Sequence, residues 1–355
     1  MLPSYLSWHQ SAHPAMTAQD VVKLVFQAHC GCGHLLGDEE SVAAYIRKEE
    51  ASLTPDASEP LTEPLGDHYV RLHMRRAMAE GITPLWIARM MQLSAKPTDD
   101  LSDRKSAFNA LCQLSETEVG FSQEELLPLA RRLVAAPAWL PGHSQAYRDA
   151  YAPAYRVISR EMERLLPILS AVAAKLRTQQ RVLLCLDGPC GSGKTTMAQQ
   201  LAAITEAACV PMDDFYTPHP LKTPERLAQP GGNADVERLL SEFLLPWREH
   251  GSGRYRPYLC AEDRFGEPIE VPARPLTILE GSYSLHPSIA KHADIRVFLT
   301  IDEKEQLRRL LIREGAEGLQ SFQRRWIPLE KAYHQAFSLP DEQCLIVDAQ
   351  PLTDV

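Results

Sequence analysis

Residues Gly188 to Thr195 read Gly-Pro-Cys-Gly-Ser-Gly-Lys-Thr and fit the phosphate-loop (Walker A) pattern G-x-x-x-x-G-K-[ST]. The glycines of such a loop let backbone N–H groups wrap around phosphates, and the following helix N-terminus adds partial positive charge. In this pattern Lys194 reaches the outer phosphates and the Thr195 hydroxyl ligates Mg²⁺. We therefore predict binding of ATP or GTP with Mg²⁺. The candidate nucleotide-binding residues are Gly188, Pro189, Cys190, Gly191, Ser192, Gly193, Lys194, Thr195 and Thr196.

The segments around the loop have the composition of the strand and helix that the motif requires. Residues 181–187 are apolar and β-prone, and residues 195–203 have helical composition. Further strand-like segments then alternate with helical ones. This alternation predicts an α/β domain over residues 179–355, with a parallel sheet covered by helices on both faces. The later predicted strands are residues 208–211, 276–279, 295–301 and 344–347.

Carboxylates follow two of these strands. Asp213 and Asp214 come directly after the second strand, and Glu280 ends the third. The carboxyl ends of parallel strands meet at the edge where α/β sheets bind ligands, so these acids are expected near the phosphate loop. We predict that Thr195 and Glu280 ligate Mg²⁺ and that Asp213 activates an acceptor hydroxyl. Structural alternatives are a helix cap for Asp213 and turn chemistry for Glu280.

Several ordered motifs in residues 180–350 resemble the P-loop kinases of the uridine kinase and phosphoribulokinase superfamily. Residues 213–216, Asp-Asp-Phe-Tyr, are similar to the Asp-Ser-Phe-Tyr of uridine kinases, and Glu280-Gly281 resembles their later Glu-Gly motif. Residues 254–258 resemble a substrate lid, and residues 305–313 resemble the arginine-bearing helix that closes over the phosphates. The resemblance implies catalytic roles for Asp213, Lys194, Arg309 and Arg313. It implies substrate contacts by Asp213, Tyr216, Asn233, Asp235, Arg256, Tyr258 and Tyr283.

The resemblance implies an ATP- and Mg²⁺-dependent kinase acting on a hydroxyl of a small metabolite, with a uridine-like nucleoside favoured. The family's Asp-His-Pro-x-Ala-x-Asp segment is replaced here by residues 231–238, Gly-Gly-Asn-Ala-Asp-Val-Glu-Arg. A phosphorylated sugar or a vitamin precursor is therefore an alternative acceptor, which Arg254, Arg256, Arg324 and Arg325 would suit. A nucleotide-dependent regulatory ATPase is a second alternative. Trp326 and Tyr333 are interpreted as core residues.

Residues 1–140 predict an all-α domain to which the sequence assigns no activity, and residues 141–178 are expected to form a linker and a connecting helix. Thr17 and Asp20 form a predicted capping box, and Gly31 is a predicted helix stop. The expected connecting helix covers residues 154–177. The helices predicted in the first domain cover residues 18–30, 39–52, 67–79, 84–93 and 122–134.

The composition limits the partners. A formal net charge of −9 over 355 residues argues against a standing role on nucleic acid or an anionic membrane. The N-terminus lacks the pattern of a secretory signal, and no run of about 18 apolar residues occurs. The eight cysteines are scattered and are interpreted as reduced thiols. We expect a cytoplasmic protein with a small-molecule acceptor as its partner; the oligomeric state is left open.

Four potential zinc ligands, His29, Cys30, Cys32 and His34, lie close together. Zinc sites usually add a second ligand pair further along the chain, yet the next cysteine is Cys112, and a glycine-rich helix stop explains the segment equally well. We predict that the purified protein carries no stoichiometric zinc. Elemental analysis that found about one zinc per chain, lost on Cys30→Ser or Cys32→Ser, would contradict this prediction.

Overall fold

In the computed structural model, the structure describes residues 2–32, 37–95, 101–135 and 142–351. The chain divides into two compact units, the first ending at Leu166 and the second running from Pro167 to Pro351. None of the helices in the described part of the chain is both long and apolar enough to cross a membrane.

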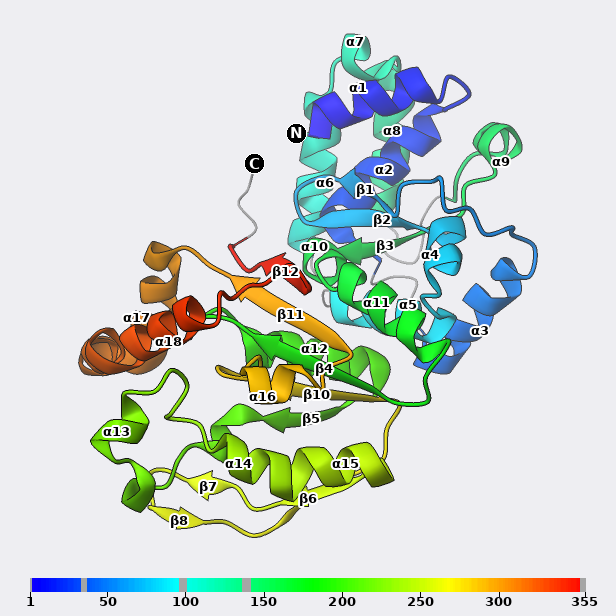
Figure 1. Cartoon of the computed structure of the whole chain (residues 1–355). Helices are drawn as coiled ribbons and strands as arrows, with labels where there is room; N and C mark the ends of the chain where they lie inside the picture. The colour runs from blue at the N-terminus through cyan, green and yellow to red at the C-terminus, as the bar shows by residue number, and fades with distance from the viewer. Residues whose placement is uncertain (1, 33–36, 96–100, 136–141, 352–355) are drawn as a thin grey trace. The chain divides into compact units, whose positions relative to one another are not determined.

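A five-stranded parallel sheet forms the centre of the second unit (Figure 1). Its order is β12-β11-β4-β10-β5, so β4 lies in the middle, and all six residues of β4 are buried. A strand covered on both faces is expected to be continuously apolar, and the sequence of β4 meets this condition. Every strand predicted for this domain is confirmed. The bounds are β4 Val182–Asp187, β5 Ala208–Pro211, β10 Leu276–Glu280, β11 Ile295–Thr300 and β12 Cys344–Asp348.

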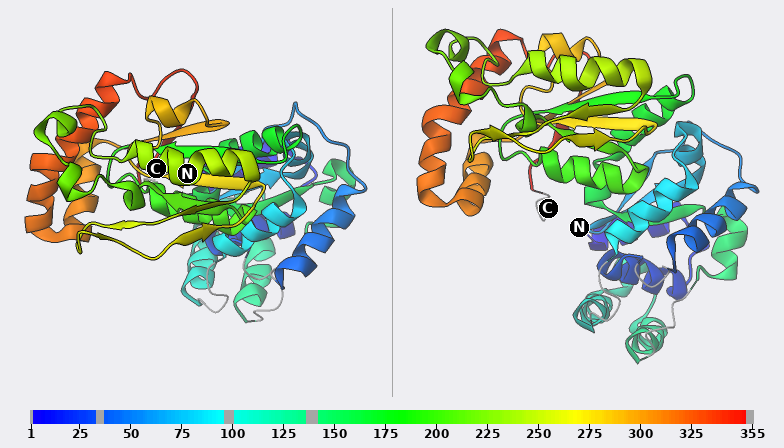
Figure 2. Two further views of the ribbon diagram at one scale, coloured as in Figure 1. Left: turned by 60° about the horizontal axis from the view of Figure 1, so that its bottom comes forward. Right: turned by 90° about the horizontal axis from the view of Figure 1, so that it is seen from below.

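Helices cover both faces of this sheet (Figure 2). Leu183 and Cys185 pack into one core with Phe243 and Trp247, which belong to the helical stretch 236–250. Alternate residues of β4 point to the opposite face, where α12 (Lys194–Thr205) packs on β4, β10 and β5. The stretch 236–250 comprises α14 Val236–Arg238, a π-helical turn Leu239–Leu244 and α15 Leu245–His250. The other helices are α11 Leu166–Leu176, α13 Pro224–Leu227, α16 Pro287–Ala290, α17 Glu303–Ser321 and α18 Ile327–Ala336.

Two short antiparallel strand pairs complete the second unit. They were not predicted, because strands of two or three residues are too short to display a hydrophobic period. They hold the segment that carries Arg254 to Tyr258, which the sequence analysis compared to a substrate lid. The pairs are β6 Gly253–Tyr255 with β9 Ile269–Val271, and β7 Tyr258–Leu259 with β8 Arg264–Phe265.

The first unit is mostly helical, as predicted. The segments expected at 18–30, 39–52, 84–93 and 122–134 are confirmed as α2, α3, α5 and α8. Gly31 ends α2 with a φ of 63°, in the left-handed region that favours glycine. The helices are α1 Leu2–Ala12, α2 Ala18–Cys30, α3 Glu39–Glu50, α4 Met74–Glu80, α5 Pro84–Ser94, α6 Leu101–Gln113, α7 Glu116–Val119, α8 Gln123–Ala135, α9 Gln145–Tyr151 and α10 Arg160–Glu163.

A three-stranded antiparallel sheet accompanies these helices, in the order β1-β2-β3 (Thr62–Leu65, Tyr69–His73 and Tyr155–Ser159). The helix expected over 67–79 is therefore wrong in its first half, which forms β2. The connecting helix expected over 154–177 is wrong at its start, which forms β3. The two strands pair in the register Tyr69 with Ser159 and His73 with Tyr155. Local periodicity could not reveal this pairing, because the partners are far apart in the chain and tertiary contacts override local preference.

A buried polar network joins α2 to the segment that leads into α9. Asp20 is fully buried and accepts hydrogen bonds from the backbone N–H of Thr17 (3.0 Å) and Ser144 (2.9 Å) and from His143 Nδ1 (2.9 Å). The predicted capping box of Thr17 and Asp20 is thus confirmed. Burial raises the pKa of Asp20, but the hydrogen bonds from His143 and Ser144 outweigh it and bring that pKa below its ordinary value. Burial lowers the pKa of His143 to about 4.

The low pKa of His143 predicts that acid destabilises the first unit. An unfolded histidine has a pKa of about 6.5, so between about pH 6.5 and pH 4 the unfolded chain binds a proton that folded His143 does not. Stability should therefore fall as the pH decreases through this window, by at most about 3 kcal/mol for this group. Hydrogen exchange of the α2 amides, corrected for intrinsic rates at pH 7 and pH 5, measures the change.

The matched variant is His143→Gln, which keeps hydrogen-bonding groups at the site but cannot take up the proton. In this variant, unfolding of α2 should take up about one proton fewer, so its free energy of unfolding should change less steeply with pH. His9, whose pKa burial also lowers, to about 2, remains in the variant and leaves a residual slope of the same sign. An unchanged pH dependence in His143→Gln would contradict the assignment to His143.

Candidate functional site

The phosphate loop connects the end of β4 to the start of α12. Three of its residues adopt the left-handed backbone region: Gly188 (φ 140°), Gly191 (76°) and Gly193 (95°). A Cβ atom at Gly188 would lie 2.5 Å from the carbonyl oxygen of Leu299 on β11. Only glycine fits there, so the loop follows the strand closely before it reaches the N-terminus of α12.

Lys194 is the first residue of α12 and is buried. Its Nζ donates hydrogen bonds to the carbonyl oxygens of Gly188 (2.7 Å) and Pro189 (3.0 Å) in the same loop. The ammonium group is thus held over the loop instead of extending into solvent. It can exchange a carbonyl oxygen for a phosphate oxygen with little movement, which is the preorganisation that electrostatic stabilisation requires.

Three strands deliver oxygen ligands to one cavity of about 480 Å³. Thr195 follows β4, Glu280 ends β10 and Asp213 follows β5. Thr195 Oγ1 donates to Glu280 Oε2 at 3.3 Å, and Asp213 is exposed on the cavity wall. Burial raises the pKa of Glu280, the Thr195 hydrogen bond opposes this, and the nearby charge of Asp213 adds to the increase.

The cavity gathers many of the residues predicted for the site. The remaining lining consists of residues that the sequence analysis did not assign to the site. The predicted residues in the lining are Cys190, Gly191, Gly193, Lys194, Thr195, Thr196, Asp213, Tyr216, Glu280, Tyr283 and Arg313, and the others are Gly281, Ser282, Glu314, Phe322, Trp326 and Glu330.

The lining fits a hard divalent cation. Four carboxylates line the cavity (Asp213, Glu280, Glu314 and Glu330), but only two cations do (Lys194 and Arg313). A polyphosphate would be repelled by this excess of acid unless a cation entered with it. Mg²⁺ is typically held by one or two carboxylates together with phosphate and water oxygens, and Thr195 with Glu280 supplies such a set.

Within residues 2–32, 37–95, 101–135 and 142–351, the structure contains no cluster of three or more His, Cys, Asp or Glu side chains arranged to hold a metal ion. His34 lies outside these residues. Cys32 is buried, its Sγ donates to the Met91 carbonyl oxygen at 3.4 Å, and burial raises its pKa to about 12. Zinc binds the thiolate form of cysteine, so this environment disfavours Cys32 as a ligand; the absence of zinc stays a prediction.

The two predicted arginines of α17 have different surroundings. Arg309 does not line the cavity: it pairs with Glu305 (2.7 Å) and donates to the carbonyl oxygens of Ser192 (3.4 Å) and Ala349 (2.6 Å). Arg313 lines the cavity and pairs with its neighbour Glu314. The helix is interrupted just beyond, at Gly315 (φ 71°, ψ −178°). Arg309 therefore braces the phosphate loop, whereas Arg313 reaches the cavity.

Four predicted substrate residues, Asn233, Asp235, Arg256 and Tyr258, lie outside the cavity lining. Asp235 caps α14 by accepting from the backbone N–H of Arg238 (3.2 Å). Arg256 Nε donates to the Gly266 carbonyl oxygen (3.0 Å), and the Tyr258 hydroxyl accepts from the His219 amide (3.1 Å). Asn233 is buried, and neither atom of its amide has a hydrogen-bond partner among the described residues. These four predicted substrate residues therefore do not line the cavity that contains the phosphate loop.

The loop that carries Asp213 is held by residues that the sequence analysis did not identify. Arg238 Nη2 donates to the carbonyl oxygen of Asp214 (2.7 Å), and the Tyr255 hydroxyl donates to Asp214 Oδ2 (2.8 Å). Burial raises the pKa of Asp214, and these donors oppose the cost of burying it. Asp214 is thus used to fix the loop, and Asp213 is left facing the cavity. The i, i+3 spacing of Asp235 and Arg238 was the sequence feature that could have drawn attention to Arg238.

Glu330 on α18 is a second omission. It is buried, its Oε2 accepts from the backbone N–H of Cys190 (2.9 Å), and its Oε1 accepts from Ser282 Oγ (2.5 Å). Trp326, Glu330 and Tyr333 share a helix face at i, i+4 and i+7, which was the available signal.

The core interpretation holds for Tyr333, which is fully buried, but not for Trp326, which lines the cavity. Its ring centroid lies 6.0 Å from that of Tyr216.

No protein-family profile and no curated protein matches the chain. Among solved structures, a candidate fructose transport system kinase from Silicibacter sp. TM1040 is 23% identical and has a TM-score of 0.40, with 48% of this chain and 94% of that one covered. A candidate uridine kinase from Bacillus stearothermophilus is 18% identical (TM-score 0.42, 53% and 100% covered). The YGR205w protein is 15% identical (TM-score 0.33, 54% and 92% covered). The similarity lies in the C-terminal half, and the N-terminal helical region is unmatched.

The position of Lys194 predicts the effect of removing its charge. Lys194→Met should weaken ATP binding by at least about a hundredfold, because the ammonium is the cation held at the loop. Isothermal titration calorimetry with Mg²⁺-ATP measures the affinity, and circular dichroism checks the fold. Arg254→Met, which removes an exposed cation that does not line this cavity, is the matched control and should bind ATP as the wild type does. Equal ATP affinity in Lys194→Met and the wild type would contradict the phosphate-loop assignment.

Proposed function

We propose that the protein is an ATP- and Mg²⁺-dependent kinase that phosphorylates a hydroxyl group of a small metabolite. The observation that carries the proposal is the single cavity lined by Lys194, Thr195, Asp213 and Glu280. It combines a phosphate cradle, a cation site and an exposed carboxylate at the carboxyl edge of a parallel sheet, where α/β proteins bind ligands. A phosphate loop alone would not distinguish a kinase from an ATPase; the carboxylate opposite the loop supports the kinase.

The proposed mechanism uses positioning more than covalent chemistry. Mg²⁺-ATP, when bound, supplies the transferable phosphoryl group and the positive charge that offsets the acidic lining. The loop amides and Lys194 hold the phosphates, while Thr195 and Glu280 hold the cation. A carboxylate oxygen of Asp213 accepts the proton of the acceptor hydroxyl, and Arg313 stabilises charge on the transferring group.

The walls of the cavity favour an acceptor with a flat ring. Tyr216, Tyr283, Phe322 and Trp326 all contribute to the lining. Aromatic side chains bind planar groups through their faces and exclude water, which would otherwise compete with the acceptor for the phosphoryl group. A uridine-like nucleoside is therefore the first acceptor to test. A phosphorylated sugar or vitamin precursor is the alternative.

A regulatory ATPase is the other function to distinguish. It would hydrolyse ATP at a rate that no small acceptor increases. A panel of nucleosides, pentoses, sugar phosphates and vitamin precursors, assayed for ADP release above the background rate, separates the two functions. We expect at least one of these classes to raise ADP release and to yield a phosphorylated product by mass spectrometry.

The neighbouring acids Asp213 and Asp214 provide the sharpest test of the kinase mechanism. A general base typically contributes about 10² to 10⁴ in rate, while ATP affinity depends mainly on the loop and the cation. Asp213→Asn should therefore retain ATP affinity within several-fold and lose acceptor phosphorylation by at least about a hundredfold. Steady-state kinetics with the acceptor identified by the panel gives this ratio.

Asp214→Asn is the matched control, since it makes the same chemical change one residue away. Its amide can still accept from the Tyr255 hydroxyl, so we expect a smaller loss of turnover. A larger loss in Asp214→Asn would mean that the catalytic aspartate is Asp214. Unchanged turnover in both variants would contradict acceptor binding at this strand edge.

A further inference from the structure

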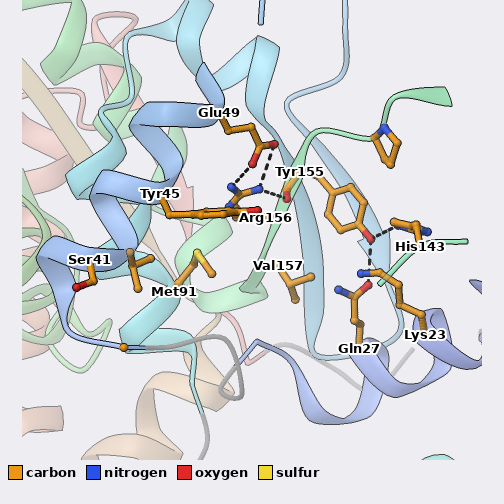
Figure 3. Close-up of a pocket in the computed structure, with 13 residues that line it drawn as sticks. Lys23, Gln27, Ser41, Tyr45, Glu49, Met91, His143, Tyr155, Arg156 and Val157 are labelled. Atoms are coloured by element: carbon orange, nitrogen blue, oxygen red, sulfur yellow. Dashed lines mark hydrogen bonds and ion pairs between the residues drawn. The ribbon is translucent and has the colours of Figure 1, made fainter. Parts of the chain in front are cut away.

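The first unit contains a cavity of its own, of about 720 Å³, formed by α2, α3, α5, the segment before α9 and β3 (Figure 3). Sites for small organic molecules usually occupy roughly 300 to 1,000 Å³, with mostly apolar walls and a few well-placed polar groups. This cavity has that composition. It is separate from the phosphate-loop cavity, and the two share no lining residue among those described.

One end of the cavity holds an ordered polar group. The Tyr155 hydroxyl lies 2.7 Å from His143 Nε2 and 3.2 Å from Gln27 Oε1. His143 is fixed in turn by its Nδ1 contact with the buried Asp20 (2.9 Å). Because the pKa of His143 is lowered to about 4, its imidazole is neutral at pH 7, with the proton on Nδ1 facing Asp20 and Nε2 able to accept from Tyr155. The network preorganises the Tyr155 oxygen at the cavity wall (Figure 3).

Lys23 supplies an uncompensated positive charge at the same end. Its Nζ lies 5.8 Å from the centroid of the Tyr155 ring. None of the described residues forms an ion pair with it. The other lining cation, Arg156, is neutralised by Glu49 through two contacts between the guanidinium and the carboxylate. With His143 neutral, the lining therefore carries one excess positive charge, and Lys23 provides it.

The rest of the cavity is suited to an apolar or aromatic group. Val42, Met91 and Val157 are buried residues of the lining. The Arg156 guanidinium donates to the Tyr155 carbonyl oxygen (2.8 Å) and lies 5.5 Å from the centroid of the Tyr45 ring, and Figure 3 shows this pair next to Met91. The exposed ring of Tyr45 offers a flat surface beside a flexible thioether, and both groups pack well against rings.

We propose that this cavity binds a small organic anion, with its carboxylate or phosphate group on Lys23 and its apolar body along Val42, Met91 and Val157. An ammonium group forms the charge-assisted hydrogen bonds that bind such anions. The apolar wall adds burial for the rest of the molecule. The first unit is thus a ligand-binding module in its own right.

Calorimetric titration of the full chain with two anionic probes tests this proposal. The probes are benzoate and phenyl phosphate, with benzamide and phenol as their neutral counterparts. Every titration is repeated in Lys194→Met, so that binding of phenyl phosphate at the phosphate loop is separated from binding in the first unit. We expect at least one anion to bind saturably, and the stronger of the two identifies a carboxylate or a phosphate ligand.

Two variants locate the site. Lys23→Met should weaken binding of the anion by at least about tenfold. Lys48→Met on α3 removes the same charge from an exposed residue outside the lining, and should leave the affinity within about twofold of the wild type. Melting curves check that each variant is folded.

Three outcomes would overturn the proposal. Neither anion binds saturably to the wild type; the neutral counterparts bind as tightly as the anions; or Lys23→Met and Lys48→Met weaken binding equally. None of these results depends on whether the second unit phosphorylates an acceptor.

Discussion

The phosphate-loop site depends on one buried carboxylate, that of Asp187 at the end of β4. It is fully buried, and its oxygens accept from the amide of Gly188 (2.7 Å), the amide of Leu285 (2.9 Å) and the Tyr333 hydroxyl (2.8 Å). Burial raises the pKa of Asp187, and the charge of Lys194 together with these donors opposes the increase. An unpaired buried carboxylate would cost several kcal/mol, so the first residue of the loop, the segment after β10 and helix α18 are all fixed around this point.

The same anchor determines what faces the loop. Tyr333 and Glu330 lie on one face of α18, so the hydrogen bond from Tyr333 to Asp187 also sets Glu330 against the Cys190 amide. The Glu330 carboxylate thereby accepts a hydrogen bond from the Cys190 N–H, and backbone N–H groups of such loops are the donors that bind phosphates. Together with Asp213 and Glu280, Glu330 gives the cavity an acidic excess that a bound divalent cation would offset. Nucleotide and divalent cation should therefore bind together.

The sequence predicted those parts of the site that are local in the chain. The run of apolar residues in β4, the glycines of the loop and the helical composition after Thr195 are adjacent, so their structure follows from short-range rules. Asp213 and Glu280 could be assigned to the same edge because parallel strands share one carboxyl end. Glu330 was not assigned, because the helix face that it shares with Trp326 and Tyr333 indicates which way it points but not its contact with the distant Cys190. The same limit explains β2 and β3, whose pairing joins His73 to Tyr155.

Burial divides the work among the three acids at the sheet edge. Burial raises the pKa of both Asp214 and Glu280; Asp213 is the only one of the three acids that is exposed, and it lines the cavity together with Glu280. Asp214 receives one protein donor at its side chain and one at its backbone carbonyl oxygen, and both contacts hold its loop in place. Glu280 has only the long contact from Thr195, and a divalent cation between them would favour its ionised form and release any proton it holds. Under the proposed mechanism, cation binding at Glu280 would therefore be linked to pH, and the exposed Asp213 would remain available to the acceptor. Under the proposed mechanism, burial and not residue type distinguishes the two adjacent aspartates: the exposed Asp213 faces the cavity and the half-buried Asp214 holds the loop.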